Sequence, residues 1–163
     1  MNSTITIAPV RKTVVVQATR HRAFEVFTAG IDRWWPKTHG IGNAPTKESI
    51  IEPHVGGRWY SICEDGSEVT VGHVLVWQPG ERFVVSWEIS AKWKPDARIA
   101  FASEVDVRFL EDGEGRTRVE LEHRNFERMG AVEGQTMHDS VDGGWPTILN
   151  LFANAASIGG NST

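Results

Sequence analysis

Residues 103–124, SEVDVRFLEDGEGRTRVELEHR, carry the strongest structural signal in this sequence. Two runs of alternating apolar and charged side chains flank a loop that contains Gly113 and Gly115. Alternation with a period of two is typical of β-strands with one buried face, and a short glycine-containing loop between two such runs is typical of a hairpin. The stretch therefore predicts two antiparallel strands, Ser103 to Leu110 and Thr117 to Arg124.

The alternation also separates the two faces of this hairpin. One face is predicted to hold the apolar residues together with His123: Val105, Val107, Phe109, Val119 and Leu121. The other face carries charges of both signs: Glu104, Asp106, Arg108, Arg116, Arg118, Glu120, Glu122 and Arg124. Mixed charges on neighbouring strands are typical of a solvated sheet face, where each exposed pair stabilises little, rather than of a catalytic carboxylate cluster.

Further strands are predicted upstream, where β-branched or alternating runs end at glycine, proline or Asp-Gly turns. They are Lys12 to Ala18, Glu48 to Pro53, Arg58 to Cys63, Glu68 to Trp77 and Arg82 to Ser90. Strict alternation in the last three predicts an inner face formed by Trp59, Ser61, Cys63, Val71, His73, Leu75, Trp77, Phe83, Val85, Trp87 and Ile89. This face is rich in large aromatic side chains.

Helical spacing appears at both ends of the chain. Thr19 is a predicted N-cap for a helix that ends at Gly30, and a second short helix, Ile31 to Trp35, is expected to end at Pro36. Residues 37–46 are predicted to form a loop. Apolar residues from Trp145 to Ser157 predict a helix of thirteen residues with Pro146 in its first turn and Gly159-Gly160 as its end. A glycine-rich stretch from Met129 to Gly144 precedes that helix in the sequence, and residues 159–163 are expected to be disordered.

Composition limits the class of protein. The chain has 163 residues, one cysteine and a formal net charge of −4. This length suits one domain, predicted here as residues 1–158. Cys63 alone cannot form an intrachain disulfide, and the acidic balance argues against a nucleic-acid partner. No apolar run reaches the length of a membrane span, and the N-terminus lacks the layout of a signal peptide, so a soluble, cytoplasmic protein is expected.

The predicted elements amount to an α+β fold: a curved antiparallel sheet with an amphipathic C-terminal helix laid across it. Seven tryptophans accompany a single tyrosine. The aromatic inner face is broader than one thirteen-residue helix covers, so an apolar cavity with indole walls is predicted between sheet and helix. The alternative is that aromatic bulk fills this space completely.

Signatures of catalysis, cofactors and metals are missing from the sequence. No two histidines show the spacing of a metal site, and no phosphate-binding glycine motif or nucleophile motif is present. Glu64 and Asp65 follow Cys63, and these acidic neighbours would raise the pKa of a thiol. The sequence therefore predicts no metal, no cofactor and no catalytic residue.

Several segments, taken in order, resemble the proteins named after the activator of heat-shock-protein-90 ATPase. They are Ala23–Thr28, Ile31–Pro36, Ile51–Trp59, Gly72–Leu75, Pro79, Arg82–Trp87, Val119–His123 and Gly144–Pro146. The resemblance covers about residues 12–157. It implies the START-like, birch-pollen-allergen-like helix-grip fold, in which a curved antiparallel sheet wraps around a long C-terminal helix and a deep cavity. It also implies binding of hydrophobic small molecules, with some members acting as polyketide cyclases or hydrolases.

Three functions follow from these observations. The first is non-catalytic binding of a hydrophobic small molecule by Trp35, Trp59, Trp87, Phe109, His123, Trp145 and Leu149. The second is a protein-interaction module for a chaperone, using the charged sheet face or loop 37–46. The resemblance implies two domains for the named activator, whereas this chain is expected to form a single domain. The third is a cyclase-like enzyme, for which His123 is the only candidate base. A lone histidine at the end of an apolar row is also typical of a purely structural residue. Homodimers are common among soluble chains.

Overall fold

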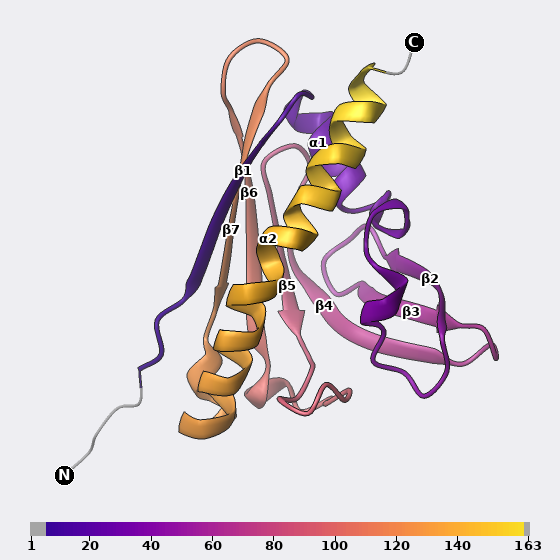
Figure 1. Cartoon of the computed structure of the whole chain (residues 1–163), viewed down its shortest axis with the longest axis vertical. Coiled ribbons are helices and arrows are strands. Elements are labelled where there is room, and N and C mark those ends of the chain that lie inside the picture. Colours follow the sequence, from indigo (N-terminus) through magenta and orange to yellow (C-terminus); the bar gives the residue numbers. More distant parts are fainter. Residues whose placement is uncertain (1–5, 162–163) are drawn as a thin grey trace.

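The computed structural model describes residues 6–161, which form a curved sheet and a long helix lying across it (Figure 1). The strands within these residues are β1 Val10–Val16, β2 Thr46–Ile51, β3 Arg58–Cys63, β4 Glu68–Gln78, β5 Arg82–Trp87, β6 Ser103–Glu111 and β7 Thr117–Arg124. The α-helices are α1 Arg20–Phe27 and α2 Ala131–Asn161. Short 3-10 helices are η1 Ile31–Arg33, η2 Lys37–His39, η3 Ile99–Phe101 and η4 Phe126–Met129.

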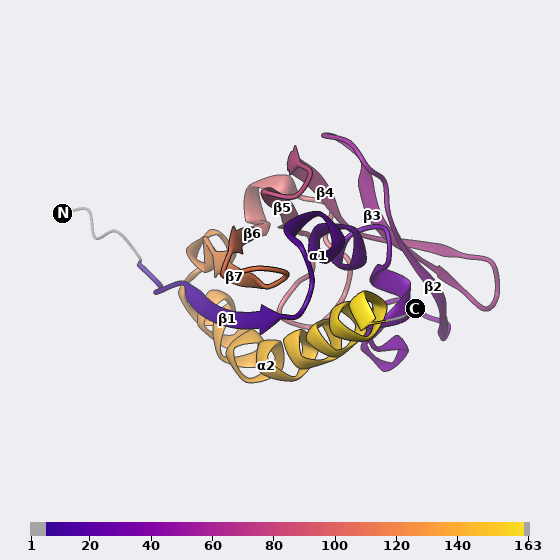
Figure 2. The same cartoon turned by 90° about the horizontal axis from the view of Figure 1, so that it is seen from above.

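All strands pair antiparallel in one sheet of order β1-β7-β6-β5-β4-β3-β2. Viewed from above, the sheet curls and α2 runs along its open side (Figure 2). This architecture confirms the predicted α+β class and the helix-grip fold. The interior between the sheet and α2 is where a ligand space is expected.

The hairpin of β6 and β7 has the predicted register. Val105 lies opposite His123, and Val107 lies opposite Leu121. All four side chains are buried, at 1% exposure or less. β1 adds to the free side of β7 and extends the same buried face.

The first helix begins as predicted. The Thr19 side chain accepts a hydrogen bond from the Arg22 amide at 3.2 Å, and Phe24 and Phe27 lie on the buried face of α1. The second helix, η1, is a single 3-10 turn that ends before Trp34 and Trp35. Loop 37–46 contains the further turn η2.

Strict alternation is wrong for the faces of β4. The register shifts opposite Trp59/Tyr60 and again between Val74 and Val76. Each shift adds one residue to β4, so that Val74 is buried, Leu75 is 39% exposed and the side chain of His73 is 40% exposed. A β-bulge re-aims the side chains that follow it, which the hydrophobic pattern alone does not reveal. His73 and Leu75 therefore do not belong to the inner face.

The C-terminal helix is much longer than predicted. α2 has 31 residues and begins at Ala131, and it contains both the glycine-rich stretch and Pro146. Met137 and Val141 are buried at four-residue intervals before Trp145, so the apolar face extends two turns upstream. Packing of that face outweighs the low helix propensity of glycine and the amide hydrogen that proline lacks. The stretch from Met129 to Gly144 is therefore mostly helix.

The predicted end of this helix also differs. α2 continues through Gly159 and Gly160 to Asn161. Residues 162 and 163, the last part of the expected disordered tail, lie outside the described residues.

One end of the interior is filled by a phenylalanine cluster. Its members come from α1, β5, β6 and α2: Phe24, Phe27, Phe83, Phe109 and Phe152. Neighbouring rings lie 5.0–6.1 Å apart, and none of the five is more than 4% exposed. This cluster holds α1 and the second half of α2 against the sheet.

Candidate functional site

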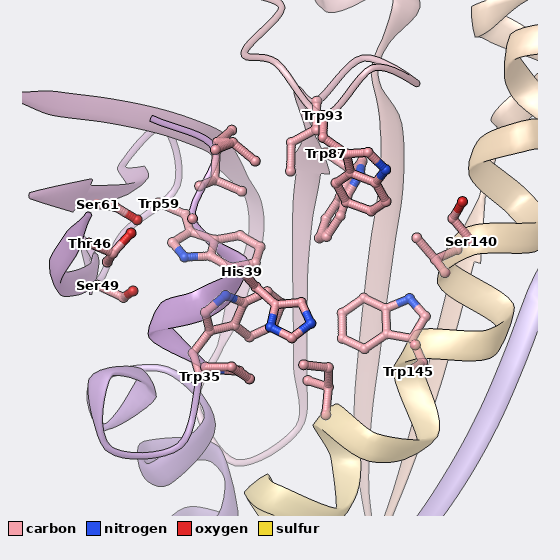
Figure 3. A pocket seen from close by; sticks show the side chains of 18 residues that line it. Trp35, His39, Thr46, Ser49, Trp59, Ser61, Trp87, Trp93, Ser140 and Trp145 are labelled. Atoms are coloured by element: carbon pink, nitrogen blue, oxygen red, sulfur yellow. The ribbon is translucent and has the colours of Figure 1, made fainter. Parts of the chain in front are cut away.

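The other end of the interior contains a cavity of about 180 Å³ that is partly open to solvent. It lies between β2, β3, the end of β5, loop 37–46 and the middle of α2 (Figure 3). Its lining residues are Trp35, Pro36, His39, Gly40, Ile41, Thr46, Ser49, Trp59, Ser61, Val71, Trp87, Ile89, Trp93, Ser140, Val141, Gly144, Trp145 and Ile148. The sequence thus predicts correctly that aromatic bulk leaves space between sheet and helix.

Five tryptophans form most of the apolar surface, and we call them the tryptophan wall: Trp35, Trp59, Trp87, Trp93 and Trp145. The rings of Trp35 and Trp59 meet edge to face at 5.0 Å, and Trp87 lies 5.9 Å from both Trp59 and Trp145. They come from four separate segments of the chain: the turn after η1, β3, β5 with the loop after it, and α2. The five indoles thus give the cavity a mainly apolar, aromatic surface, which suits an apolar guest.

Hydroxyl groups gather on the side of the cavity formed by β2 and β3. Thr46, Ser49 and Ser61 all line this side (Figure 3). Thr46 Oγ1 is buried and has no hydrogen-bond partner among residues 6–161. The same holds for Nε1 of Trp87. Buried polar atoms are almost always paired in proteins, so two unpaired ones in the wall of one cavity are unusual.

His123 lies behind the wall. It is fully buried, and its Nδ1 accepts a hydrogen bond from Nε1 of Trp145 at 3.1 Å. Because an indole nitrogen can only donate, Nε2 of His123 carries the proton and donates to Ser103 Oγ at 2.8 Å. Burial lowers the pKa of His123 to about 3, with a smaller effect from the charge of His138, so the ring is neutral at pH 7. His123 therefore orients Trp145.

Comparison with known proteins adds the family. A model described as Activator of Hsp90 ATPase homolog 1-like protein matches residues 17–157. The chain belongs to this family. That match confirms the resemblance found in the sequence. A search of curated proteins gave no significant match.

Solved structures resemble this family member along nearly its whole length. The anthrahydroquino-gamma-pyrone synthase Txn09 is 38% identical, with 92% of this chain and 97% of the other covered and a TM-score of 0.65. The self-sacrificing resistance protein CalC from Micromonospora echinospora is 31% identical, with 95% and 97% covered and a TM-score of 0.69. The Aha1 dimer from Colwellia psychrerythraea shares the fold at 15% identity, with 94% and 98% covered and a TM-score of 0.63.

The structure brings together four of the seven predicted site residues. Trp35, Trp59, Trp87 and Trp145 all line the cavity. Phe109 instead packs on Phe24 and Phe27 in the phenylalanine cluster. His123 and Leu149 are buried outside the lining.

Sequence reasoning missed part of the site. His39 and Thr46 lie in the predicted loop 37–46 and Trp93 follows the predicted strand that ends at Ser90, and no periodic pattern marks such residues as part of a cavity lining. The local signal for Trp93 was its residue type, because a large aromatic side chain in a polar loop is uncommon. His39 is the single titratable side chain among the lining residues, so the wall holds no carboxylate and no lysine or arginine.

The charged outer face of β6 and β7 is an ion-pair network. Asp106 is buried under Arg82 and Arg124, whose nitrogens lie 2.8 and 2.7 Å from its carboxylate. Burial alone would raise the pKa of Asp106, but hydrogen bonds from these two arginines outweigh it and the pKa is lowered. The charges of this face thus pair with one another, and Asp106 at its centre is shielded from water.

Two further features concern the predicted absences. No group of three or more His, Cys, Asp or Glu within residues 6–161 is arranged to hold a metal ion. No helix in this part of the chain is long and apolar enough to cross a membrane.

Proposed function

We propose that this protein binds a flat, aromatic small molecule in the cavity lined by the tryptophan wall. The observation that carries the proposal is a cavity of about 180 Å³ whose apolar surface comes from five indoles. Pockets lined mainly by aromatic and apolar side chains with a few polar groups are typical of small-molecule sites. Thr46, Ser49 and Ser61 supply polar groups in the lining, and Thr46 Oγ1 and Trp87 Nε1 are buried without a partner among residues 6–161.

The cavity volume limits the ligand. A dry protein cavity of about 150 Å³ holds a benzene molecule, whereas pockets for drug-sized ligands span about 300–1,000 Å³. At about 180 Å³, the present cavity suits one aromatic ring with a small substituent or a fused second ring. A larger polycyclic ligand would extend through the open side or displace part of the wall.

The relatives support an aromatic ligand. Txn09 is by name a synthase of an anthrahydroquino-gamma-pyrone, and it is 38% identical to this chain. We infer that the ligand of this protein is also an oxygenated fused-ring compound. The site is proposed as a binding site, because His39 is the single titratable group in the cavity lining and the lining contains no acid-base pair.

The test is a titration with anthraquinone-2-sulfonate and with 1-indanone, followed by tryptophan fluorescence and by calorimetry. We expect saturable quenching and a one-site heat signal for at least one probe. A Val71→Phe variant places a ring in the cavity and should abolish the saturable component. Val15→Phe, on an exposed β1 position, is the matched control and should bind as the natural protein does. Absence of binding to the natural protein by both methods would contradict the proposal.

Catalysis is the second candidate, favoured by the identity to a synthase. A ring closure needs a group that accepts or donates a proton near the reacting atoms. His39 is the residue of the cavity lining that can accept or donate a proton. His123 is not, because both of its nitrogens already form hydrogen bonds with Ser103 and Trp145. A phenolic open-chain precursor would be converted by the natural protein and not by His39→Gln, with mass spectrometry as the readout. Equal conversion by both proteins would exclude this role of His39.

Chaperone assistance remains a prediction from the family description. Loop 37–46 supplies four residues to the cavity lining. If this loop is also the partner surface proposed from the sequence, binding of a partner would change the affinity for the ligand. Stimulation of the ATPase rate of heat-shock protein 90 tests this candidate. The expected homodimer is tested separately by light scattering.

A further inference from the structure

The indole N–H of Trp87 is enclosed by protein and lacks a hydrogen-bond partner, unlike the indole N–H groups of Trp34 and Trp145. Trp87 is 4% exposed, and its Nε1 finds no acceptor among residues 6–161. Nε1 of Trp34, in contrast, donates to the Val26 carbonyl oxygen at 2.8 Å, and Nε1 of Trp145 donates to His123. Leaving a buried donor unpaired destabilises a protein, which makes this exception informative.

The neighbours of Trp87 explain why the donor stays unpaired. The nearest polar ring is that of His123, with its centroid 5.0 Å from the indole of Trp87. Both nitrogens of His123 are already engaged, with Trp145 and Ser103. The surrounding rings of Trp59 and Trp93 offer no acceptor. A partner for Trp87 must therefore come from outside the chain.

We propose that the ligand presents a hydrogen-bond-accepting oxygen, such as a ring carbonyl, to Nε1 of Trp87. This inference rests on the proposed function and adds the group that the site recognises. A site built to pair with a ligand oxygen rejects the analogue that lacks it, because its own buried donor is then left without a partner. The site should therefore distinguish an aromatic ketone from the matching hydrocarbon.

The test uses a matched pair, 1-indanone and indane, which differ by one carbonyl oxygen. The ratio of their dissociation constants is measured for the natural protein, for Trp87→Phe and for Trp77→Phe. Trp87→Phe should reduce the preference for the ketone by roughly three- to tenfold, as expected for one hydrogen bond. Trp77 packs on Phe24 and Phe83 outside the cavity lining, so Trp77→Phe removes an indole N–H away from the cavity and should leave the preference unchanged.

The outcomes separate this inference from the proposed function. If the natural protein binds both compounds and Trp87→Phe keeps the same preference, the role of Trp87 is wrong and the binding site stands. If neither these compounds nor the anthraquinone binds, both fail. Should Trp87→Phe not fold, the indole N–H proton resonance of Trp87 in the natural protein decides the question. It must move downfield with 1-indanone and not with indane.

A separate observation concerns Trp93. Within residues 6–161, Trp93 and Asn125 are the non-glycine residues with positive φ, at 60° and 69°. Asparagine tolerates this left-handed conformation, whereas a bulky side chain is strained in it. The loop that imposes it is well bonded, with the Trp93 amide donating to the Ser90 carbonyl oxygen at 2.8 Å. The backbone would accept glycine more readily.

Stability does not account for Trp93. Its side chain is 42% exposed and meets Trp87 edge to face at 6.5 Å, at the border of the cavity. Strained residues persist where the surrounding structure enforces them, and they gather at ligand-binding sites. We infer that Trp93 covers the mouth of the cavity and contacts the bound ligand. Nε1 of Trp87 is shut off from water, so a ligand reaches it only when a neighbouring side chain moves, and Trp93 is the neighbour that is 42% exposed.

Trp93→Gly tests this role because it relieves strain and removes the contact together. We expect an unchanged or higher melting temperature and an affinity for 1-indanone lowered about fivefold or more, as for loss of an aromatic contact. Phe101→Ala is the control, since Phe101 is 41% exposed and lies outside the cavity lining. Unchanged affinity in Trp93→Gly, or an equal loss in Phe101→Ala, would overturn the inference while leaving the binding site intact.

Discussion

The phenylalanine cluster and the tryptophan wall have similar ring spacings and opposite degrees of filling. Neighbouring rings lie 5.0–6.1 Å apart in the cluster and 5.0–6.5 Å apart in the wall. The rings of the cluster are covered on all sides, whereas those of the wall enclose about 180 Å³. Ring-to-ring distance therefore does not tell a packed core from a binding site. What differs is which sides of each ring are covered.

The chemistry of the two side chains explains part of this difference. Phenylalanine has no polar atom and packs without further conditions, whereas each buried indole needs an acceptor. Trp34, next to the phenylalanine cluster, finds one in the chain, and Trp87 in the wall does not. The filled end should therefore determine stability, and the hollow end should determine what binds.

The largest expected effect is at the filled end. Phe152→Ala removes a fully buried ring between α2 and Phe27, and it should lower the free energy of unfolding by about 3–5 kcal/mol. Denaturant titration measures this value. In any preparation that remains folded, affinity for 1-indanone should stay the same. A large loss of affinity would break the separation between the two ends.

The second effect is on acid stability. The pKa of His123 falls from 6.5 to about 3 on folding, so between these pH values the unfolded chain binds the additional proton. Stability should therefore fall as the pH drops, by about 2–3 kcal/mol from pH 7 to pH 4.5. His123→Leu should flatten this dependence, whatever its stability at pH 7. Aspartates with lowered pKa values, such as Asp106, lose their contribution only at still lower pH. An equally steep dependence in the variant would show that His123 is not the cause.

The third prediction compares one substitution at both ends. Val107→Phe adds volume to a fully packed position and should destabilise the protein by about 1–3 kcal/mol. Val71→Phe directs the same added volume into the cavity and should change stability by less than about 1 kcal/mol. Thermal unfolding of both variants measures the difference. Equal destabilisation would mean that the cavity wall is as tightly packed as the cluster.

The smallest effect concerns α2 where it passes the cavity. A Cβ added to Gly143 would meet no atom within 4 Å, so alanine fits this helical position. Gly143→Ala should stabilise the protein by about 0.5–1 kcal/mol through helix propensity. The control is Gly134→Ala, which should destabilise because a Cβ there collides with the Phe126 carbonyl oxygen. Stabilisation by both would contradict the close packing seen at Gly134.

Sequence reasoning succeeded where periodicity governs structure. The 103–124 hairpin follows from side-chain alternation, and the first helix follows from the Thr19 cap and the helical spacing after it. It was wrong where one added residue or tertiary packing overrides the local pattern. The two bulges in β4 turn His73 and Leu75 outward, and the buried face of α2 carries the helix across its glycines and Pro146.

The assignment of Phe109, His123 and Leu149 to the site had a different source of error. Alternation places a residue on the inner face of a sheet, but it does not say which end of the interior that residue occupies. Phe109 lies on the inner face and fills the packed end. His123 faces inward and is covered by Trp145. Distance along the curved sheet separates Phe109 from the cavity, whereas the rings of Trp87 and Trp145 separate His123 from it.

Pro146 lies close to the boundary between the two ends. It follows Trp145 of the wall and precedes Phe152 of the cluster by less than two turns of α2. Because proline has no amide hydrogen, the carbonyl group of Asp142 lacks its usual donor in the helix, and bending there meets less resistance. The helix thus has a flexible point between the part that lines the cavity and the part that packs in the phenylalanine cluster. A lineage of such proteins could reshape one side of that point for new compounds while the other side goes on folding as before.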